Sequence, residues 1–312
     1  MKKLLLIFNP NAGKGKIQNV LVDIIKLFSD GGYLTTAYPT KARKDAYEFA
    51  LKHESEYDVI VCAGGDGTLN EVVGAVLKNG IGTPIGFIPG GTMNDWGSNL
   101  GIPADMMKAA QVIVEGEPVA FDIGKFNTHS NFNYVAAFGA FTEIAYDTPQ
   151  SMKKIIGQTA YGVSALKSLT QLRPYKLKVE YDEGKVIEGN YLFGMACNSK
   201  IIGGFKLTGM HTDLHDGKFE IALIKEIKNP LDFTGLLGAV IAQNYMNREN
   251  IDIVEVSKAK FIFEEPVKWT LDGEYGGCVR EAEVDIVPDA INFIIRDPEP
   301  VMTSKKLTEQ NN

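Results

Sequence analysis

Residues 63–71 read Ala-Gly-Gly-Asp-Gly-Thr-Leu-Asn-Glu, and this stretch decides how the first half of the chain is interpreted. The apolar run at 57–62 directly before it predicts a buried parallel strand. Apolar residues then recur with helical spacing from Leu69 to Leu77, which predicts a helix that begins just after the glycines. Open α/β sheets bind their ligands at such strand-to-helix turns, at the carboxyl ends of the strands.

The composition of this turn allows two interpretations. A helix N-terminus offers free N–H groups and a positive dipole end to a phosphate, and glycine lets the backbone approach that phosphate closely. Alternatively, Thr68 and Glu71 fit the S/T-x-x-E capping box, in which case the turn is only structural. An aspartate between glycines at a sheet edge is costly to keep for structure alone, so we favour phosphate binding.

Bulk properties limit the classes of protein that fit. A length of 312 residues predicts two domains, and 45% apolar with 23% charged residues is typical of an ordinary globular protein. The net charge of −7 and the pI of about 5.3 argue against nucleic acid as a partner, because such proteins carry a basic face.

Cysteine usage and the N-terminus indicate the compartment. Cys62, Cys197 and Cys278 are too few and too scattered for a disulfide framework or a zinc site, which fits a reducing cytoplasm. The apolar core at 4–8 stops at Asn9-Pro10 and is too short for a secretory signal, so we expect a first β-strand there. No apolar run approaches the length of a membrane span.

Two further strands of the first half are expected to end in glycine loops. The loop at 9–16 follows the first strand and carries two lysines, and a helix is expected after it to about Ser29. The loop at 89–96 follows a short strand at 84–88 and precedes a helix predicted from Pro103 to about 115. Neither the Walker A pattern nor G-x-G-x-x-G occurs. Three glycine loops at successive strand ends should lie along one sheet edge.

The pattern changes near residue 122, after which strands dominate and predict a mainly antiparallel β-sandwich. We expect an α/β nucleotide-binding domain at 1–122 plus about 296–312, and a sandwich domain at 123–295. Helical inserts are expected at Ser151–Leu172 and Leu231–Met246, and the last strand is expected to return the chain to the first domain. The predicted strands of this half are 132–138, 175–181, 186–198, 219–225, 251–256, 259–263, 267–271, 283–287 and 291–295.

Four motifs in this order resemble the diacylglycerol kinase catalytic family, whose members include bacterial lipid kinases, sphingosine kinases and ceramide kinases. They are Asn9-Pro10 with Gly13-Lys14, the stretch from Gly64 to Glu71, Pro89-Gly90-Gly91-Thr92 with Asn94-Asp95, and Leu271-Asp272-Gly273-Glu274. The resemblance covers almost the whole chain and is closest to the bacterial branch, because nothing is appended to the two-domain core. It implies an NAD kinase/diacylglycerol kinase-like first domain that binds ATP with Mg²⁺.

The same resemblance implies the residues of the nucleotide site. The glycine loops would wrap the phosphates, and a threonine after the second strand would join them. The residues so implied are Asn9, Pro10, Asn11, Ala12, Gly13, Thr40, Gly64, Gly65, Asp66, Gly67, Thr68, Leu69, Asn70, Glu71 and Thr92.

Catalytic and metal-binding roles are also implied. Glu274 matches the general base of the family, and Asp66 would act through a Mg²⁺–water network or beside that base. A carboxylate whose pKa is raised in a dry cleft suits a base for an alcohol nucleophile. A structural Mg²⁺ would be held by Asp213, Asp216 and the main-chain oxygen of Lys218, although family members can carry serine at the position of Asp213.

The function implied is the transfer of the γ-phosphate of ATP to a lipid hydroxyl, with diacylglycerol giving phosphatidic acid as the favoured reaction. An NAD kinase, which shares the G-G-D-G-T loop, and a catalytically silent regulator that binds nucleotide or lipid remain alternatives. The basic, apolar segment 152–173 could contact the inner face of a membrane or be an ordinary surface helix. Which lipid is used and whether the chain forms a homodimer stay open.

Overall fold

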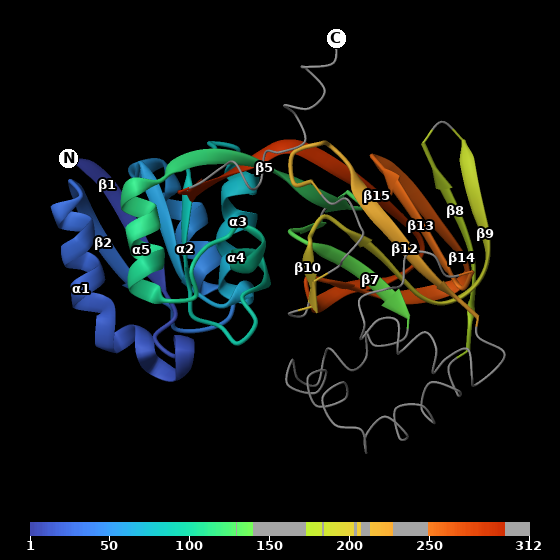
Figure 1. Cartoon of the computed structure of the whole chain (residues 1–312), viewed down its shortest axis with the longest axis horizontal. Helices are drawn as coiled ribbons and strands as arrows, with labels where there is room; N and C mark the ends of the chain where they lie inside the picture. The colour runs from blue at the N-terminus through green and yellow to red at the C-terminus, as the bar shows by residue number, and fades with distance from the viewer. Residues whose placement is uncertain are drawn as a thin grey trace, which may run out of the picture. The chain divides into compact units, whose positions relative to one another are not determined.

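The computed structural model describes residues 1–128, 130–139, 173–182, 184–202, 205–206, 213–226 and 249–296. The chain divides into two compact units, one formed by Met1–Asp122 with the chain from Pro288, the other by Ile123–Val287 (Figure 1). The predicted inserts at 151–172 and 231–246 lie outside the described residues, as does the C-terminal tail. None of the described helices has both the length and the hydropathy that crossing a membrane requires.

The first unit is built on a parallel sheet. Its strands are β1 (Lys2–Phe8), β2 (Tyr33–Pro39), β3 (Val59–Gly64) and β4 (Ile85–Pro89), and the end of β15 (Glu274–Ile295) pairs with β4 through Phe293 and Ile85. The spatial order is β15-β4-β3-β1-β2. All residues of β3 and β4 are buried, because helices cover both faces of a parallel sheet and its strands are therefore continuously apolar.

The helices of this unit pack in two pairs. α1 (Lys16–Asp30) contacts α5 (Met106–Glu115), and α2 (Asp45–His53) contacts α3 (Asp66–Asn79). The chain moves outward from β1 to β2 and then returns to β3 on the other side of β1. The order of strands therefore reverses at β1 and β3, which is the switch point where open α/β sheets bind ligands.

Short elements complete the first unit. Two 3₁₀ turns lie at Ala12–Gly15 (η1) and Glu54–Glu56 (η2). A short helix, α4 (Asp95–Asn99), follows the third glycine loop and was not predicted from the sequence. The helix expected from Pro103 begins at Met106, because the carboxylate of Asp105 caps it by accepting the amide of Lys108.

The second unit is an antiparallel β-structure, as predicted. Two long strands, β9 (Lys185–Cys197) and β14 (Lys258–Leu271), each pair with β8 (Tyr175–Tyr181) at one end and with β7 (Val135–Gly139) at the other. These four strands therefore form a closed circuit of hydrogen-bonded pairs. The remaining strands are β5 (Glu117–Phe126), β6 (Ser130–Phe132), β10 (Ile201–Ile202), β11 (Phe205–Lys206), β12 (Phe219–Lys225) and β13 (Ile251–Val256).

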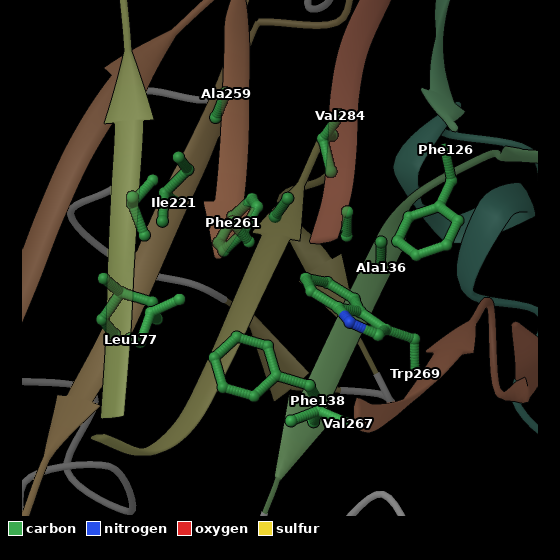
Figure 2. Packing of buried hydrophobic residues seen from close by; sticks show 14 of the residues in the cluster. Phe126, Ala136, Phe138, Leu177, Ile221, Ala259, Phe261, Val267, Trp269 and Val284 are labelled. Atoms are coloured by element: carbon green, nitrogen blue, oxygen red, sulfur yellow. The ribbon is translucent and has the colours of Figure 1, made fainter. Parts of the chain in front are cut away.

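The core of the second unit is centred on Trp269. Its ring lies 5.0 Å from that of Phe138, 5.1 Å from that of Phe126 and 5.2 Å from that of Phe261, centroid to centroid (Figure 2). All four side chains are almost completely buried. Because they come from β5, β7 and β14, this cluster ties together strands that are far apart in the sequence.

Two pairs of predicted strands are single strands in the structure. The runs at 259–263 and 267–271 belong to β14, and those at 283–287 and 291–295 belong to β15. The register between β14 and β15 shifts between Ile262 and Val267, so β14 continues through an irregularity. The polar Glu264-Glu265-Pro266 segment had suggested that one strand ends there and another begins. The predicted return of the chain to the first unit is confirmed by the pairing of Phe293 with Ile85.

Candidate active site

The three glycine loops of the first unit are joined by main-chain hydrogen bonds. The amide of Asn9 donates to the carbonyl of Ala63 at 2.9 Å, and the amide of Gly90 donates to that of Gly64 at 2.6 Å. The amide of Gly13 donates in turn to the carbonyl of Gly90. Loops that follow β1, β3 and β4 thus form one continuous surface of main chain at the carboxyl edge of the sheet.

Close packing explains the double glycines in two of these loops. A Cβ atom at Gly91 would lie 2.7 Å from the Cα of Gly65, and one at Gly90 would lie 2.7 Å from the Cβ of Ala12. Both distances are below any normal contact, so the loops approach this closely only without side chains. Asn94 stabilises the arrangement, because its side chain accepts the amide of Gly91 at 2.7 Å and donates to the carbonyl of Gly91 at 3.0 Å.

Gly67 has a different reason to be glycine. It is the second residue of α3 and lies at an exposed position, and a Cβ atom there would meet nothing within 4 Å. The N-cap residue of α3, Gly65, makes no side-chain hydrogen bond to the first turn of the helix. Glycine has no side chain that could cap the helix, so this N-terminus keeps the arrangement that suits a phosphate.

The capping-box interpretation of Thr68 and Glu71 is wrong. The helix begins at Asp66, so Thr68 is its third residue and not its N-cap. The carboxylate of Glu71 instead accepts the amides of Lys44 at 2.7 Å and Ala46 at 3.2 Å. Glu71 therefore caps the start of α2, a different helix, and fixes the end of the β2–α2 loop at Lys44.

Thr40 lies in that loop. Its amide donates to the carbonyl of Phe8 at 2.8 Å, which places it at the carboxyl end of β2 next to β1. The carboxylate of Asp45 accepts the amide of Lys41 at 2.7 Å and the hydroxyl of Tyr38 at 2.9 Å. Two carboxylates, those of Asp45 and Glu71, thus determine the shape of the loop that carries Thr40.

Asp66 points toward the start of α4. Its Oδ1 accepts the amide of Trp96 at 3.3 Å, and the amides of Asp95 and Asn94 also act on the carboxylate. Burial raises the pKa of Asp66, while these amides partly offset that effect. Asp95 is itself buried, and so is Asp122, whose Oδ1 accepts the amide of Asp289 at 2.9 Å. Asp66 is therefore a partly desolvated carboxylate beside the glycine loops.

The other residues predicted for the nucleotide site are distributed around this surface. Asn11 and Thr92 are exposed, and Asn9, Pro10, Gly13 and Asn70 are partly buried. Ala12 and Leu69 have buried side chains and contribute packing, and the amide of Leu69 is used within α3 by donating to Gly65. Sequence reasoning did not assign Asn94 to the site, although the conformation of the Gly90-Gly91 loop depends on it.

Glu274 belongs to the second unit and follows a two-residue turn between β14 and β15. Leu271 and Glu274 are paired, and Asp272 and Gly273 between them both have positive φ, 50° and 83°. This is a type I′ hairpin turn, for which Asp-Gly is a preferred pair. The side chain of Glu274 is exposed at the tip of the hairpin.

The predicted metal-binding loop also lies in the second unit. Asp213 accepts the amide of His215 at 3.1 Å, and Asp216 accepts the amide of Lys218 at 3.0 Å. Desolvation raises the pKa of Asp216 to about 6, and the charges of Asp213 and Glu255 contribute to the shift. Carboxylate oxygens are the ligands that Mg²⁺ prefers, and Asp213 and Asp216 supply two of them from one short loop, so the donor set fits Mg²⁺. No cluster of three or more His, Cys, Asp or Glu side chains that could hold a metal ion occurs among the described residues.

Comparison with known proteins identifies the family. Residues 3–126 match the diacylglycerol kinase catalytic domain, and residues 138–295 match the YegS C-terminal NAD kinase beta sandwich-like domain. The chain is 33% identical over 281 residues to a diacylglycerol kinase of Bacillus subtilis (strain 168), covering 89% of this chain and 92% of the relative. The chain belongs to the diacylglycerol kinase family.

A further relative supports this family assignment, and two solved structures support the fold. A diacylglycerol kinase of Staphylococcus aureus (strain MRSA252) is 36% identical over 279 residues, which cover 88% of this chain and 87% of the relative. A crystal structure of a diacylglycerol kinase from Bacillus anthracis str. Sterne aligns over 96% of this chain and 98% of its own, with a TM-score of 0.74 at 22% identity. Another structure from that organism gives a TM-score of 0.80 at 24% identity, over 96% and 99% of the two chains.

Membership of the diacylglycerol kinase family confirms the predicted fold and the predicted enzyme class. The two matched domains correspond to an α/β domain and a β-sandwich-like domain, and the chain is a lipid kinase. These relatives are named diacylglycerol kinases, so the NAD kinase alternative gains no support from them.

Proposed function

We propose that this lipid kinase transfers the γ-phosphate of ATP, with Mg²⁺, to the free hydroxyl of diacylglycerol and so produces phosphatidic acid. The observation that carries the proposal is the continuous main-chain surface formed by the three hydrogen-bonded glycine loops, next to the N-terminus of α3, which no N-cap side chain covers. Charged phosphates require well-positioned donors more than covalent help from the enzyme, and main-chain amides supply them without conformational freedom.

In this proposal the phosphate chain of ATP lies over Gly64, Gly65 and Gly67, with the loop at 9–13 on one side and that at 90–94 on the other. The open space at Gly67 supports it, because packing within the protein does not require a glycine there. Thr40 and Thr92 would border the nucleotide at the rim of this surface, and Asn70 would do so from the first turns of α3.

The partly desolvated Asp66 is proposed as the residue of this unit that acts on the metal. Bound Mg²⁺ would neutralise the negative charge that develops on the transferred phosphoryl group. The carboxylate of Asp66 is already oriented by the amides at the start of α4, so it would hold metal-bound water with little loss of side-chain freedom.

Glu274 is proposed as the general base that accepts the proton of the lipid hydroxyl. Its exposure at a hairpin tip supports this role, because a base must reach its substrate within hydrogen-bond distance. Diacylglycerol stays in the bilayer, so the reaction would require peripheral contact with the membrane surface on the cytoplasmic side, where ATP is present.

Purified protein incubated with labelled ATP, Mg²⁺ and mixed micelles of different lipid alcohols tests this function. We expect label in phosphatidic acid when diacylglycerol is supplied, and no label in the product when NAD replaces it. Glu274→Gln should lower turnover to a small residual rate and leave ATP binding near normal, with Glu264→Gln, an exposed glutamate on β14, as the matched control. Phosphorylation of NAD, or of a sphingoid base in preference to diacylglycerol, would contradict the proposed substrate.

A further inference from the structure

The turn that carries Glu274 is held by an unusual number of contacts to a single side chain. The carboxylate of Asp272 accepts three consecutive amides, those of Asn133 at 2.6 Å, Tyr134 at 3.0 Å and Val135 at 3.0 Å. Its own amide donates to the carbonyl of Val135 at 2.8 Å, and its carbonyl accepts the hydroxyl of Tyr134 at 3.2 Å. Every polar group of Asp272 is thus bonded to the segment 133–135.

Burial makes this set of bonds hard to open. Asp272, Asn133 and Tyr134 are 9%, 3% and 7% exposed. If the carboxylate moved away, three amides would lose an ionised acceptor in a place that water reaches poorly, and each such loss is unfavourable. Asp272 has φ of 50°, a conformation that the type I′ turn requires and that aspartate adopts more readily than most residues, so the bonds add to the preference of the turn itself.

The geometry connects this clamp directly to Glu274. The pairing of β14 with β7 ends at Leu271 and Ala136, and the contacts of Asp272 continue it past the start of β7. On the other side of the turn, Leu271 pairs with Glu274. The main chain of Glu274 is therefore tied to Leu271, and the turn before it is tied to the segment 133–135 through Asp272, while the side chain of Glu274 remains exposed.

We propose that Asp272 is a positioning residue for Glu274: its buried carboxylate holds the hairpin tip by the amides of 133–135 and so sets the place of the base. This inference rests on the proposed role of Glu274. A displacement of a catalytic group by about 1 Å can lower a rate about 100-fold, so the clamp has a direct kinetic consequence. If Asp272 served folding alone, its substitution would lower the amount of native protein and leave the rate constant of that native protein unchanged.

A double-mutant cycle separates positioning from folding. We expect Asp272→Asn to lower kcat about 10- to 100-fold. The asparagine side chain keeps one acceptor oxygen but loses the second oxygen and the negative charge of the carboxylate, so the turn is held less firmly. The Kd for ATP, measured by calorimetry, should change less than about twofold, since the glycine loops are untouched. In a Glu274→Gln background the same substitution should change the residual rate less than about twofold, because its effect passes through the base.

The control is Asp182→Asn. Asp182 is also a turn aspartate of the second unit with positive φ, 26°, and its carboxylate accepts the amide and hydroxyl of Ser257 at 3.3 and 3.4 Å. It should leave kcat within about twofold of the original value. If Asp272→Asn does not fold, Tyr134→Phe provides a milder perturbation, because it removes only the hydrogen bond from the Tyr134 hydroxyl to the turn. It should lower kcat several-fold in the original protein and have little effect on the residual rate of Glu274→Gln.

Amide hydrogen exchange tests the clamp apart from catalysis. The amides of Asn133, Tyr134 and Val135 should exchange at least about tenfold faster in Asp272→Asn, and in Asp182→Asn their exchange should be unchanged. Equal losses of rate from Asp272→Asn in the original and the Glu274→Gln backgrounds would overturn the proposal. Full activity of Glu274→Gln would also overturn it, because Glu274 would then not be the base. Absence of any lipid product from the unmodified protein would refute the proposed function itself.

Discussion

The carboxylate of Glu71 accepts the amide of Lys44 at 2.7 Å, although the two residues lie 27 positions apart. It accepts the amide of Ala46 as well, so one side chain on α3 caps the start of α2 and holds Lys44 at φ of 69°. The β2–α2 loop that carries Thr40 thereby takes its shape from a residue of the glycine-rich motif. Glu71 is in a position to affect nucleotide binding without touching the nucleotide.

Glu71→Ala should therefore weaken ATP binding more than it slows transfer. We expect the KM for ATP to rise about tenfold, equivalent to about 1.4 kcal/mol, with kcat within about threefold. The loss of two capping bonds should also lower the free energy of unfolding by about 1–2 kcal/mol. Steady-state kinetics and urea unfolding measure both effects. Glu48→Gln, in the exposed part of the first turns of α2, is the control and should change neither.

Gly67→Ala should leave the free protein folded and impair nucleotide binding. A Cβ atom at this position meets nothing, and alanine favours a helix by up to about 1 kcal/mol over glycine, so the melting temperature should stay constant or rise. The new methyl group would occupy the space assigned to phosphate and raise the Kd for ATP at least about tenfold. Gly74→Ala in the same helix, where the Cβ atom makes an ordinary 3.6 Å contact with Tyr47, should stabilise without any effect on ATP. Unchanged affinity in Gly67→Ala would mean that phosphate does not lie there.

Asp66→Asn should separate the charge of this side chain from its hydrogen bonds. Asparagine can still accept the amide of Trp96, so α4 should keep its place and unfolding should change little. Loss of the negative charge should lower kcat about 100-fold or more if the carboxylate acts on bound Mg²⁺. Asp105→Asn is the matched control, since Asp105 also bonds an amide at a helix start, that of α5. A rate within about threefold of the original would rule out a catalytic role for the charge of Asp66.

Asp216 should make the metal-free protein less stable as pH rises from about 4 to about 6. Its folded pKa of about 6 is above the ordinary value, so the native state binds more protons in this window and stability falls with increasing pH. Asp216→Asn should flatten this part of the stability curve, whereas Asp23→Asn on the surface of α1 should not. Thermal unfolding in EDTA at several pH values measures the difference between the variants.

Addition of Mg²⁺ at a pH of about 7.5 provides the second half of this test. A cation bound between Asp213 and Asp216 would stabilise the ionised form and raise the melting temperature of the unmodified protein. The increase should be absent in Asp216→Asn. If both proteins respond equally, the cation binds elsewhere.

Local sequence patterns accounted for much of the candidate site. The apolar strand before Gly64 and the helical spacing after Asp66 are properties of neighbouring residues, so β3, α3 and the turn between them could be predicted. The short α4 could not, because a helix of five residues has too little periodicity to be detected. The continuity of β15 over 22 residues was missed because pairing with partner strands, and not composition, sustains it.

The order of strands, helices and glycine loops, and the types of residue available for phosphoryl transfer, follow from spacing along the chain and could be predicted from it. Which of these groups meet depends on the folded chain. Glu71 caps α2, which its own sequence motif does not indicate. Asp272 accepts amides that lie 137 to 139 positions away in the chain. Hydrogen bonds of this kind depend on how strands and helices pack together, and packing is a property of the whole fold.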